Sequence, residues 1–262
     1  MTHSPQMGRI ISRGMANLFQ LILERMGYCV YRYQEPPKPD PSKRYNTIAT
    51  RYTHRAPFPW KTYSPWFDRT FLSVYDGVRG VTLIPEDRCY YIYHLAEYCA
   101  HLGGTMAECG VYRGGSAYFI ALALERSQST DRHLHLFDTF SGMPAKYISK
   151  NDPHKPNEFS RTSLAEVRAI LADYSFVEFH PGTIPETFSS IEESTRFSFV
   201  HLDVDLYRSN KSCCEYFYGR MITGGVLLFD EYGFEGYEFT ERLAIDEFFK
   251  DKPEHPFVLP TG

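Results

Sequence analysis

The chain has 262 residues, of which 43% are hydrophobic, and its 28 basic and 32 acidic side chains give a net charge of −4. This length and composition predict one or two globular domains and exclude a disordered chain. The acidic balance argues against a nucleic-acid partner, which would need a basic surface. No stretch approaches the ~18 apolar residues of a membrane span. The six cysteines lack a Cys-x-x-Cys pair, so we expect a reducing, cytoplasmic compartment.

Residues 1–80 differ in character from residues 81–262, and we expect them to form a separate N-terminal segment. Apolar residues recur at three- or four-residue steps over Met7–Tyr31, which predicts a helix. This helix is either an arm that packs on the body or on a second subunit, or a membrane-surface helix. Residues 34–65 interleave prolines with aromatic side chains, which predicts an ordered loop that covers a site as a lid. The apolar arm also favours a homodimer.

Helices and strands alternate from residue 85 onward. The expected elements are a helix over 88–102, a strand over 104–109, a helix over 115–126, a strand over 133–137, a helix over 162–174, strands over 177–180 and 197–202, a helix over 207–221, a strand over 225–229 and a helix over 239–249. This order is typical of βαβ units with right-handed crossovers. It predicts an α/β fold with a mostly parallel, doubly wound, Rossmann-like sheet and helices on both faces.

Acidic residues stand at the ends of four of the five expected strands, where parallel sheets bind their ligands. They are Glu108, Asp138, Asp203 with Asp205, and Asp230 with Glu231. Chance and helix N-caps are the alternative explanation. Asp203 and Asp230 would end adjacent strands, because their spacing fits one βαβ crossover. Clustered carboxylates repel one another unless a cation lies among them, so we expect Mg²⁺ rather than pairing with Arg or Lys side chains.

The loop after the first expected strand reads Glu108-Cys-Gly-Val-Tyr-Arg-Gly-Gly-Ser116. Its glycines permit a sharp turn, and the helix that follows offers free N–H groups to a carboxylate. The spacing differs from Gly-x-Gly-x-x-Gly, which counts against a nicotinamide dinucleotide. An acid before the first glycine suits the amino group of a methionine-derived ligand, and Asp138 suits two ribose hydroxyls.

Four motifs in this order resemble the macrocin O-methyltransferase (TylF/MycF) family over roughly residues 81–249. They are Glu-Cys-Gly-Val-Tyr-Arg-Gly-Gly-Ser, Phe-Asp-Thr-Phe-Ser-Gly-Met-Pro, His-Leu-Asp-Val-Asp-Leu-Tyr-Arg-Ser and Gly-Gly-Val-Leu-Leu-Phe-Asp-Glu-Tyr-Gly. The resemblance implies an S-adenosylmethionine-dependent and Mg²⁺-dependent O-methyltransferase with a seven-stranded Rossmann-like sheet. Many members methylate hydroxyls of sugars or natural products, so it implies a small hydroxylated acceptor.

The resemblance also implies roles for individual residues. Those expected at the cofactor are Glu108, Gly110 and Ser116 beside its methionine part, Asp138 at the ribose, and Ser141 and Gly142 beside the adenosine. From their place between the loop glycines, Tyr112 and Arg113 are also expected at the cofactor, although a protein acid is an alternative partner for Arg113. Those expected at the metal are Asp203, Asp230 and Glu231. Asp205 is a fourth acid at the metal or a base, and Asp203 is the other candidate base. The family often has Asp where this chain has Glu231, so the position of the metal would differ.

Several alternatives stay open on the sequence alone. A catechol would chelate the ion as well as a sugar diol, and the aromatic N-terminal segment would suit it. An oxidoreductase with a nucleotide cofactor or a non-catalytic binding protein could use a similar sheet. Each histidine is a candidate base in isolation, and His180 is the best of them because it follows the third expected strand.

Overall fold

The computed structural model describes residues 64–127, 133–259 and 261. The expected helical arm, its dimer contact and most of the expected lid fall on residues 1–63, outside the described residues. Residues 64–262 form one compact unit, to which everything below refers. No helix among the described residues is long and apolar enough to cross a bilayer.

Helices and strands alternate along this unit as the sequence predicts. In chain order the elements are η2 (Pro65–Phe67), α3 (Arg69–Val78), α4 (Glu86–Ala100), β1 (Thr105–Cys109), α5 (Gly115–Arg126), β2 (Leu134–Asp138), η3 (Ala145–Tyr147), α6 (Leu164–Ile170), β3 (Val177–Pro181), η4 (Glu186–Ser190), β4 (Phe197–Leu202), α7 (Tyr207–Phe217), η5 (Tyr218–Arg220), β5 (Met221–Phe229) and α8 (Glu241–Phe249).

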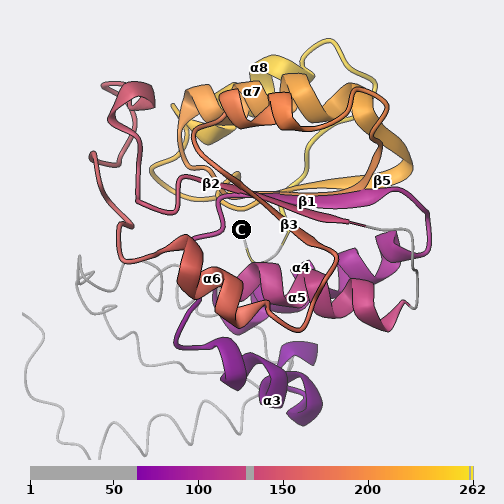
Figure 1. Cartoon of the computed structure of the whole chain (residues 1–262). Helices are drawn as coiled ribbons and strands as arrows, with labels where there is room; N and C mark the ends of the chain where they lie inside the picture. Colours follow the sequence, from indigo (N-terminus) through magenta and orange to yellow (C-terminus); the bar gives the residue numbers. More distant parts are fainter. Residues whose placement is uncertain (1–63, 128–132, 260, 262) are drawn as a thin grey trace, which may run out of the picture. The chain divides into compact units, whose positions relative to one another are not determined.

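The strands pair in the order β3-β2-β1-β4-β5, and every pairing is parallel. Helices α4 and α5 cover one face of the sheet, and α7 and α8 cover the other (Figure 1). The predicted doubly wound α/β fold is therefore confirmed. The described residues contribute five strands to this sheet, whereas the family resemblance implies seven.

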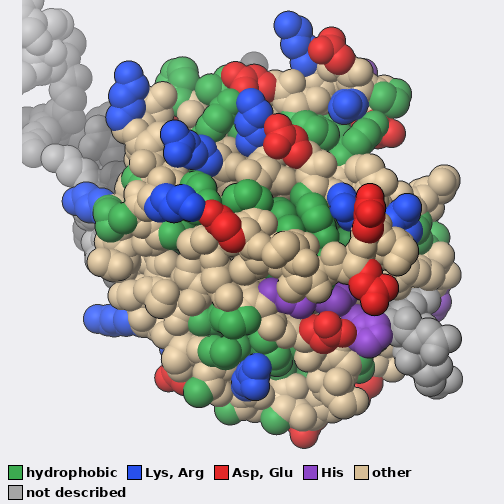
Figure 2. Space-filling model, turned by 45° about the horizontal axis from the view of Figure 1, so that its top comes forward, with side chains coloured by type: hydrophobic (Ala, Val, Ile, Leu, Met, Phe, Trp, Pro, Cys, Tyr) green, Lys and Arg blue, Asp and Glu red, His purple; other side chains and the backbone are tan. Residues whose placement is uncertain are grey.

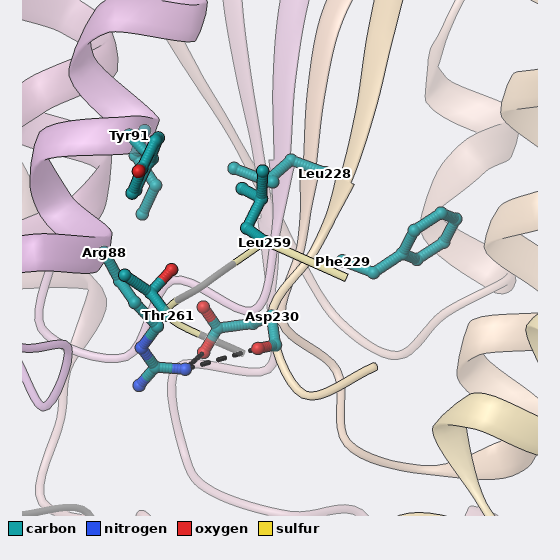
Figure 3. A pocket seen from close by; sticks show the side chains of 8 residues that line it. Arg88, Tyr91, Leu228, Phe229, Asp230, Leu259 and Thr261 are labelled. Carbon is teal, nitrogen blue, oxygen red and sulfur yellow. Dashed lines mark hydrogen bonds and ion pairs between the residues drawn. The ribbon is translucent and has the colours of Figure 1, made fainter. Parts of the chain in front are cut away.

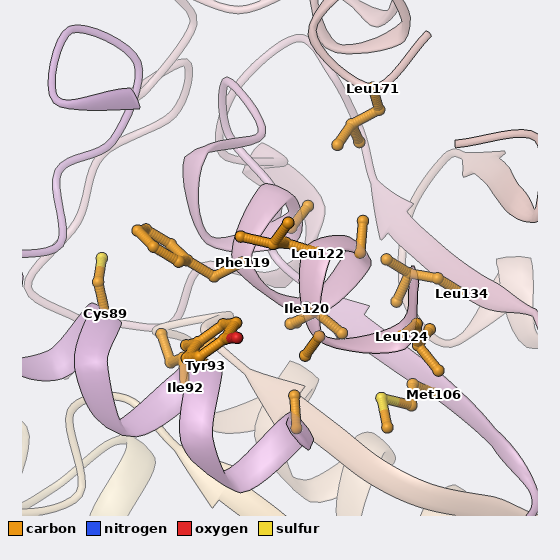
Figure 4. Packing of buried hydrophobic residues seen from close by; sticks show 14 of the residues in the cluster. Cys89, Ile92, Tyr93, Met106, Phe119, Ile120, Leu122, Leu124, Leu134 and Leu171 are labelled. Carbon is orange, nitrogen blue, oxygen red and sulfur yellow. The ribbon is translucent and has the colours of Figure 1, made fainter. Parts of the chain in front are cut away.

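The larger core lies between the sheet and helices α4 and α5 (Figure 4). Met106 of β1 and Leu134 of β2 are fully buried there, as are Phe119 and Ile120 of α5. Helix α5 is buried along most of its length, from Gly115 to Leu124, which explains why it is apolar all round rather than amphipathic. Burial of this helix fixes its N-terminus just beyond the end of β1.

Helix α3 is an element that the sequence analysis does not predict. The side chain of Asp68 caps it by accepting hydrogen bonds from the N–H groups of Thr70 and Phe71. Phe71, Tyr75 and Val78 form its buried face, and the Phe71 ring stacks on that of Phe119 in α5. In the sequence, the helical spacing of these three residues and the aspartate before them indicate this helix. Helix α3 therefore shares the core of the sheet domain.

The C-terminal part of the sheet begins earlier than expected. Strand β5 starts at Met221 rather than at residue 225, and α7 ends at Phe217 rather than at residue 221. The register between β4 and β5 shifts between Phe197 and Phe199, where Gly224 has a φ of +83°. The strand was expected to begin at the second of the two adjacent glycines, but both lie inside it, at this irregularity.

Candidate active site

Asp203 and Asp230 follow two neighbouring strands directly. Strand β4 ends at Leu202 and β5 at Phe229, and these two residues are partners in the register of the sheet. The sequence prediction that both acids lie at the ends of adjacent strands is thus confirmed. Because both strands run in the same direction, the loops that follow them share one edge of the sheet.

Three carboxylates come together at this edge. Asp203, Asp205 and Glu231 each offer one oxygen, and the three oxygens lie within 4.8 Å of one another. Glu231 is buried, and its Oε2 has no hydrogen-bond partner among the described residues. Burial, followed by the charge of the neighbouring acids, raises the pKa of both Asp203 and Glu231 well above the usual range. The group is therefore short of positive charge.

Asp230, the third predicted metal ligand, is held from the side by Arg88 of α4. The Nη1 atom of Arg88 lies 2.7 Å from Oδ2 of Asp230 and donates to its backbone carbonyl at 3.3 Å. The same Nη1 is 3.9 Å from Oε1 of Glu231. Arg88 and Asp230 both line a pocket that Leu228 and the C-terminal Leu259 and Thr261 complete (Figure 3).

Glu108 and His201 form a fully buried ion pair in the middle of the sheet. The Nδ1 atom of His201 lies 2.8 Å from Oε1 of Glu108, and its Nε2 faces Oδ1 of Asp230 at 3.6 Å. Burial alone would lower the pKa of His201, but its interactions with the carboxylates of Asp230 and Glu108 raise it to about 10. The two acids therefore favour the protonated form of His201. Oε2 of Glu108 has no partner among the described residues.

Asp205 is fixed by two donors from distant parts of the chain. Its Oδ1 lies 3.0 Å from Nε2 of His154 and accepts a hydrogen bond of 3.1 Å from the hydroxyl of Tyr237. Burial opposes the charged form of His154, but Asp205 and then Glu158 raise its pKa. Asp205 has a φ of +57°, a left-handed conformation that is rare outside glycine and common at functional sites.

The surroundings of this cluster carry more acidic than basic groups. The carboxyl groups are those of Glu108, Asp203, Asp205, Asp230, Glu231 and Glu241, and the basic groups are those of Arg88, His154 and His201. A buried excess of carboxylates requires either protonation or a cation. Oxygen ligands in this number and spacing are those that Mg²⁺ prefers, and the orphaned Oε2 of Glu231 supplies a free one. The residues present therefore fit the metal.

The glycine loop lies directly against the acid cluster. Gly110 has a φ of +85°, and a Cβ at this position would lie 1.7 Å from the backbone oxygen of Asp203. Only glycine allows the loops after β1 and β4 to approach so closely. Helix α5 begins after Gly114, and no side chain caps its N-terminus. Its first N–H groups are available to an anionic ligand.

Asp138 organises the same loop from the end of β2. Its Oδ2 accepts hydrogen bonds from the N–H groups of Val111 and Tyr112 at 2.7 and 2.9 Å, and its Oδ1 accepts one from Phe140 at 2.6 Å. Tyr112 and Phe140 both have a φ of +50°. The carboxylate thus holds two strained loops at the predicted cofactor site in place.

The other residues predicted at the cofactor lie on the same loops. Ser116 is buried in the first turn of α5, and Ser141 and Gly142 follow β2. Arg113, expected to pair with the cofactor or with a protein acid, donates to the backbone carbonyl of Gly80 at 3.0 Å. None of these arrangements tests the cofactor roles, which stay predictions.

Arg88, Tyr237 and Glu241 are residues of the cluster that the sequence analysis did not single out. Glu241 is fully buried at the start of α8, and its Oε1 accepts a hydrogen bond from the N–H of Glu231 at 3.0 Å. His154 lies beside Asp205 and His201 lies beside Glu108 and Asp230, whereas the predicted His180 belongs to another group, on β2 and β3. The spacing of His154 and Glu158, which suits a local pair, was the one signal available.

Comparisons with known proteins point to one family. Residues 79–253 match the family model of the macrocin-O-methyltransferases (TylF). The 8-demethyl-8-(2,3-dimethoxy-alpha-L-rhamnosyl)-tetracenomycin-C 4'-O-methyltransferase of Streptomyces olivaceus is 30% identical over 142 residues, which are 50% of this chain and 54% of that protein. The mycinamicin III 3''-O-methyltransferase of Micromonospora griseorubida is 28% identical over 58% of this chain and 65% of that protein. The chain therefore spans about half to two thirds of the length of these curated relatives.

Two solved structures share the fold. The O-methyltransferase NovP superposes with a TM-score of 0.57 and 24% identity, over 65% of this chain and 74% of that one. The calicheamicin methyltransferase CalS11 superposes with a TM-score of 0.58 and 17% identity, over 88% of this chain and 97% of that one. The family model matches more than half of the residues of this chain, which therefore belongs to the macrocin O-methyltransferase (TylF) family.

Proposed function

We propose that this protein is an S-adenosylmethionine-dependent O-methyltransferase, assisted by Mg²⁺, which methylates a sugar hydroxyl of a small natural product. The observation that carries the proposal is the buried excess of carboxylates beside the uncapped N-terminus of α5. The relative from Streptomyces olivaceus is named for a rhamnosyl-bearing acceptor, and CalS11 is named as a TDP-rhamnose 3'-O-methyltransferase. These names favour a deoxysugar as the acceptor.

The cofactor would lie across the ends of β1 and β2. The free Oε2 of Glu108 would accept a hydrogen bond from the cofactor's amino group, and the N-terminus of α5 would bind its carboxylate. Asp138 keeps a lone pair on Oδ1 for a ribose hydroxyl, since Phe140 supplies its one short hydrogen bond. Tyr112, Arg113, Ser116, Ser141 and Gly142 complete this assignment.

The metal would bind Asp203 and Glu231, two of the three acids whose oxygens lie within 4.8 Å of one another, and Asp230, whose Oδ2 Arg88 also binds. Asp205, the third acid of that group, would lie beside it. When bound, S-adenosylmethionine supplies an activated methyl group, and Mg²⁺ supplies Lewis acidity that lowers the proton affinity of a hydroxyl. An aliphatic hydroxyl holds its proton about as tightly as water does, so it needs this assistance more than a phenol with a pKa of ~10. This difference is a second reason to favour a sugar.

Asp205 is the best-placed base of the two candidates. His154 and Tyr237 both bind its Oδ1, so the side chain is held in one orientation while Oδ2 remains to accept the hydroxyl proton. The fixed carboxylate would also orient the attacking oxygen toward the methyl group. Asp203 is the poorer candidate, because burial and then the negative charge of Asp230 raise its pKa. Both effects favour its protonated form, which cannot accept a proton.

A labelled-methyl transfer assay tests the proposal. The full chain is incubated with methyl-labelled S-adenosylmethionine and one of three acceptors: a nucleotide-linked deoxysugar, a rhamnosylated aromatic glycoside or a simple catechol. We expect label on a sugar hydroxyl, loss of transfer in EDTA and in Glu231→Gln, and recovery of the wild-type enzyme when Mg²⁺ is restored. The exposed Glu193→Gln serves as the matched control. Transfer to the catechol alone would show that the acceptor is a phenol rather than a sugar. Full turnover in EDTA would show that the reaction does not need the metal.

A further inference from the structure

A second group of metal-ligating side chains lies on β3, at one edge of the described sheet, and on its neighbour β2. In their register His135 is opposite Glu178, and Phe137 is opposite His180. His135, Glu178 and His180 each offer one ligand atom, and the three atoms lie within 4.8 Å of one another. Histidine side chains gather beside acidic ones on this face of the molecule (Figure 2).

This group lies within β2 and β3, whereas the acid cluster follows β4 and β5, so the two groups are separate. His135 precedes Asp138, the last residue of β2, by three positions, which is about 10 Å along a strand at ~3.3 Å per residue. Its ring contacts those of Phe137 and Phe197, and Phe137 packs against Phe217 of α7. The group therefore lies on the α7 face of the sheet, partly buried and open to solvent at Glu178.

The hydrogen bonds of Ser190 fix the ring of His180. The Ser190 hydroxyl donates its proton to the backbone carbonyl of Thr187 at 2.7 Å, because a carbonyl can only accept. Toward Nδ1 of His180, at 2.8 Å, the same oxygen must then accept, so Nδ1 carries the proton. The lone pair of the neutral ring is consequently on Nε2, which faces Nδ1 of His135 at 3.0 Å.

The spacing of the ligand atoms matches a tetrahedral ion. Nδ1 of His135 lies 3.0 Å from Nε2 of His180 and 3.6 Å from Oε2 of Glu178. Ligands bound at ~2.0–2.1 Å to a tetrahedral zinc ion are about 3.3 Å apart. We propose that His135, Glu178 and His180 form a binding site for a zinc-like transition-metal ion, with water as the fourth ligand.

The neighbouring residues support such a site. Nδ1 of His133 lies 2.6 Å from Oε1 of Glu178, so His133 orients the carboxylate and leaves Oε2 toward the histidines. Burial lowers the pKa of His135 to about 4, which keeps the ring neutral, as ligation requires. In the metal-free molecule Nδ1 of His135 donates its proton in a hydrogen bond to Nε2 of His180. When the metal binds Nδ1 of His135, the proton of this ring would be on its own Nε2 instead. The ion would clamp the edge strand β3 to β2.

Imidazole ligands favour zinc over magnesium, which allows the two sites to be measured separately. The full chain is stripped with EDTA, dialysed against excess Mg²⁺ and titrated with Zn²⁺ by calorimetry. We expect one equivalent to bind, because Mg²⁺ occupies oxygen ligands and does not compete for imidazoles. Titration with Co²⁺ should give the visible absorption of a tetrahedral site.

Three variants test the ligands, and two serve as controls. His180→Gln and the half-exposed Glu178→Gln should each weaken Zn²⁺ binding by about 100-fold or more, and Ser190→Ala by about tenfold. His94→Gln removes an exposed histidine that pairs with Glu97 at 3.1 Å, and it should bind Zn²⁺ normally, as should Asp203→Asn. Absence of Zn²⁺ binding, or binding that survives in Glu178→Gln and His180→Gln but is lost in Asp203→Asn, would overturn the proposal.

Discussion

Arg88 of α4 binds both the side chain and the backbone carbonyl of Asp230, although 142 residues separate them in the sequence. The pair is buried, and the Arg88 guanidinium also lies over the ring of Phe234 at 4.8 Å. The charge of Asp230, with that of Glu231, raises the pKa of Arg88 despite its burial. Arg88 thus positions a carboxylate that the proposed function assigns to the metal.

Removing Arg88 should therefore unbalance the site. Arg88→Met leaves the charge of Asp230 buried without its partner, and the free energy of unfolding should fall by about 3–5 kcal/mol. The double variant Arg88→Met/Asp230→Asn removes both charges and should recover part of this loss. Urea denaturation in EDTA measures both effects. Equal stability of the wild type and Arg88→Met would mean that the ion pair does not contribute to the fold.

Glu231→Gln should separate stability from metal binding. In the metal-free protein this change removes a buried carboxyl whose pKa is raised, so the melting temperature should rise in EDTA. The wild type should gain melting temperature on addition of Mg²⁺, because an ion that binds the native state stabilises it, and the variant should not. The control is Glu193→Gln. An equal Mg²⁺-dependent gain in Glu231→Gln would place the ion elsewhere.

Two glycine substitutions should have opposite effects. Gly110→Ala places a methyl group 1.7 Å from the backbone oxygen of Asp203 and imposes a φ of +85° on alanine. The left-handed backbone alone costs about 1–3 kcal/mol, and the steric clash adds to it. Gly77→Ala, in the last turn of α3 with nothing within 4 Å, should instead stabilise the protein, by up to about 0.5–1 kcal/mol. Thermal melts of the two variants test the pair, and a tolerated Gly110→Ala would contradict the close approach.

Stability should depend on the protonation of His201. Its pKa in the folded protein is about 10, above the ordinary 6.5, so protonated His201 stabilises the fold fully below pH 6.5. This contribution is lost as the pH rises from 6.5 through 10. Urea midpoints in EDTA should therefore fall more steeply over this range in the wild type than in His201→Gln. The exposed His101→Gln should follow the wild type, and identical profiles for His201→Gln would show that the ring is not charged.

The alternation of elements and the acids at the strand ends could be predicted because both are local patterns. The strand that ends before Asp203 and the strand that ends before Asp230 were placed side by side from their spacing alone, and the register confirms it. Helix α3 was missed, since the short spacing of Phe71 and Tyr75 follows a segment rich in proline. Intrinsic helix propensity is a weak signal next to such a segment, and the packing of Phe71 against Phe119 stabilises the helix.

The partners of the acids could not be predicted, because they come from distant parts of the chain. Arg88 reaches Asp230 from α4, and Tyr237 and His154 reach Asp205 from two separate loops. Nothing in a single sequence links such residues before the fold brings them together. The role of Glu108 was assigned from its position before Gly110, and its pairing with His201 depends on the register between β1 and β4.

Calorimetric titration with S-adenosylhomocysteine, with and without Mg²⁺, tests the central claim most directly. We expect one equivalent to bind the full chain in either condition, because the loops after β1 and β2 are to hold the cofactor independently of the metal. Glu108→Gln should weaken binding by about tenfold or more, as loss of a charge-assisted hydrogen bond of roughly 1.5–3 kcal/mol requires. Absence of binding in both conditions, while NAD binds, would contradict the assignment of this site to methyl transfer.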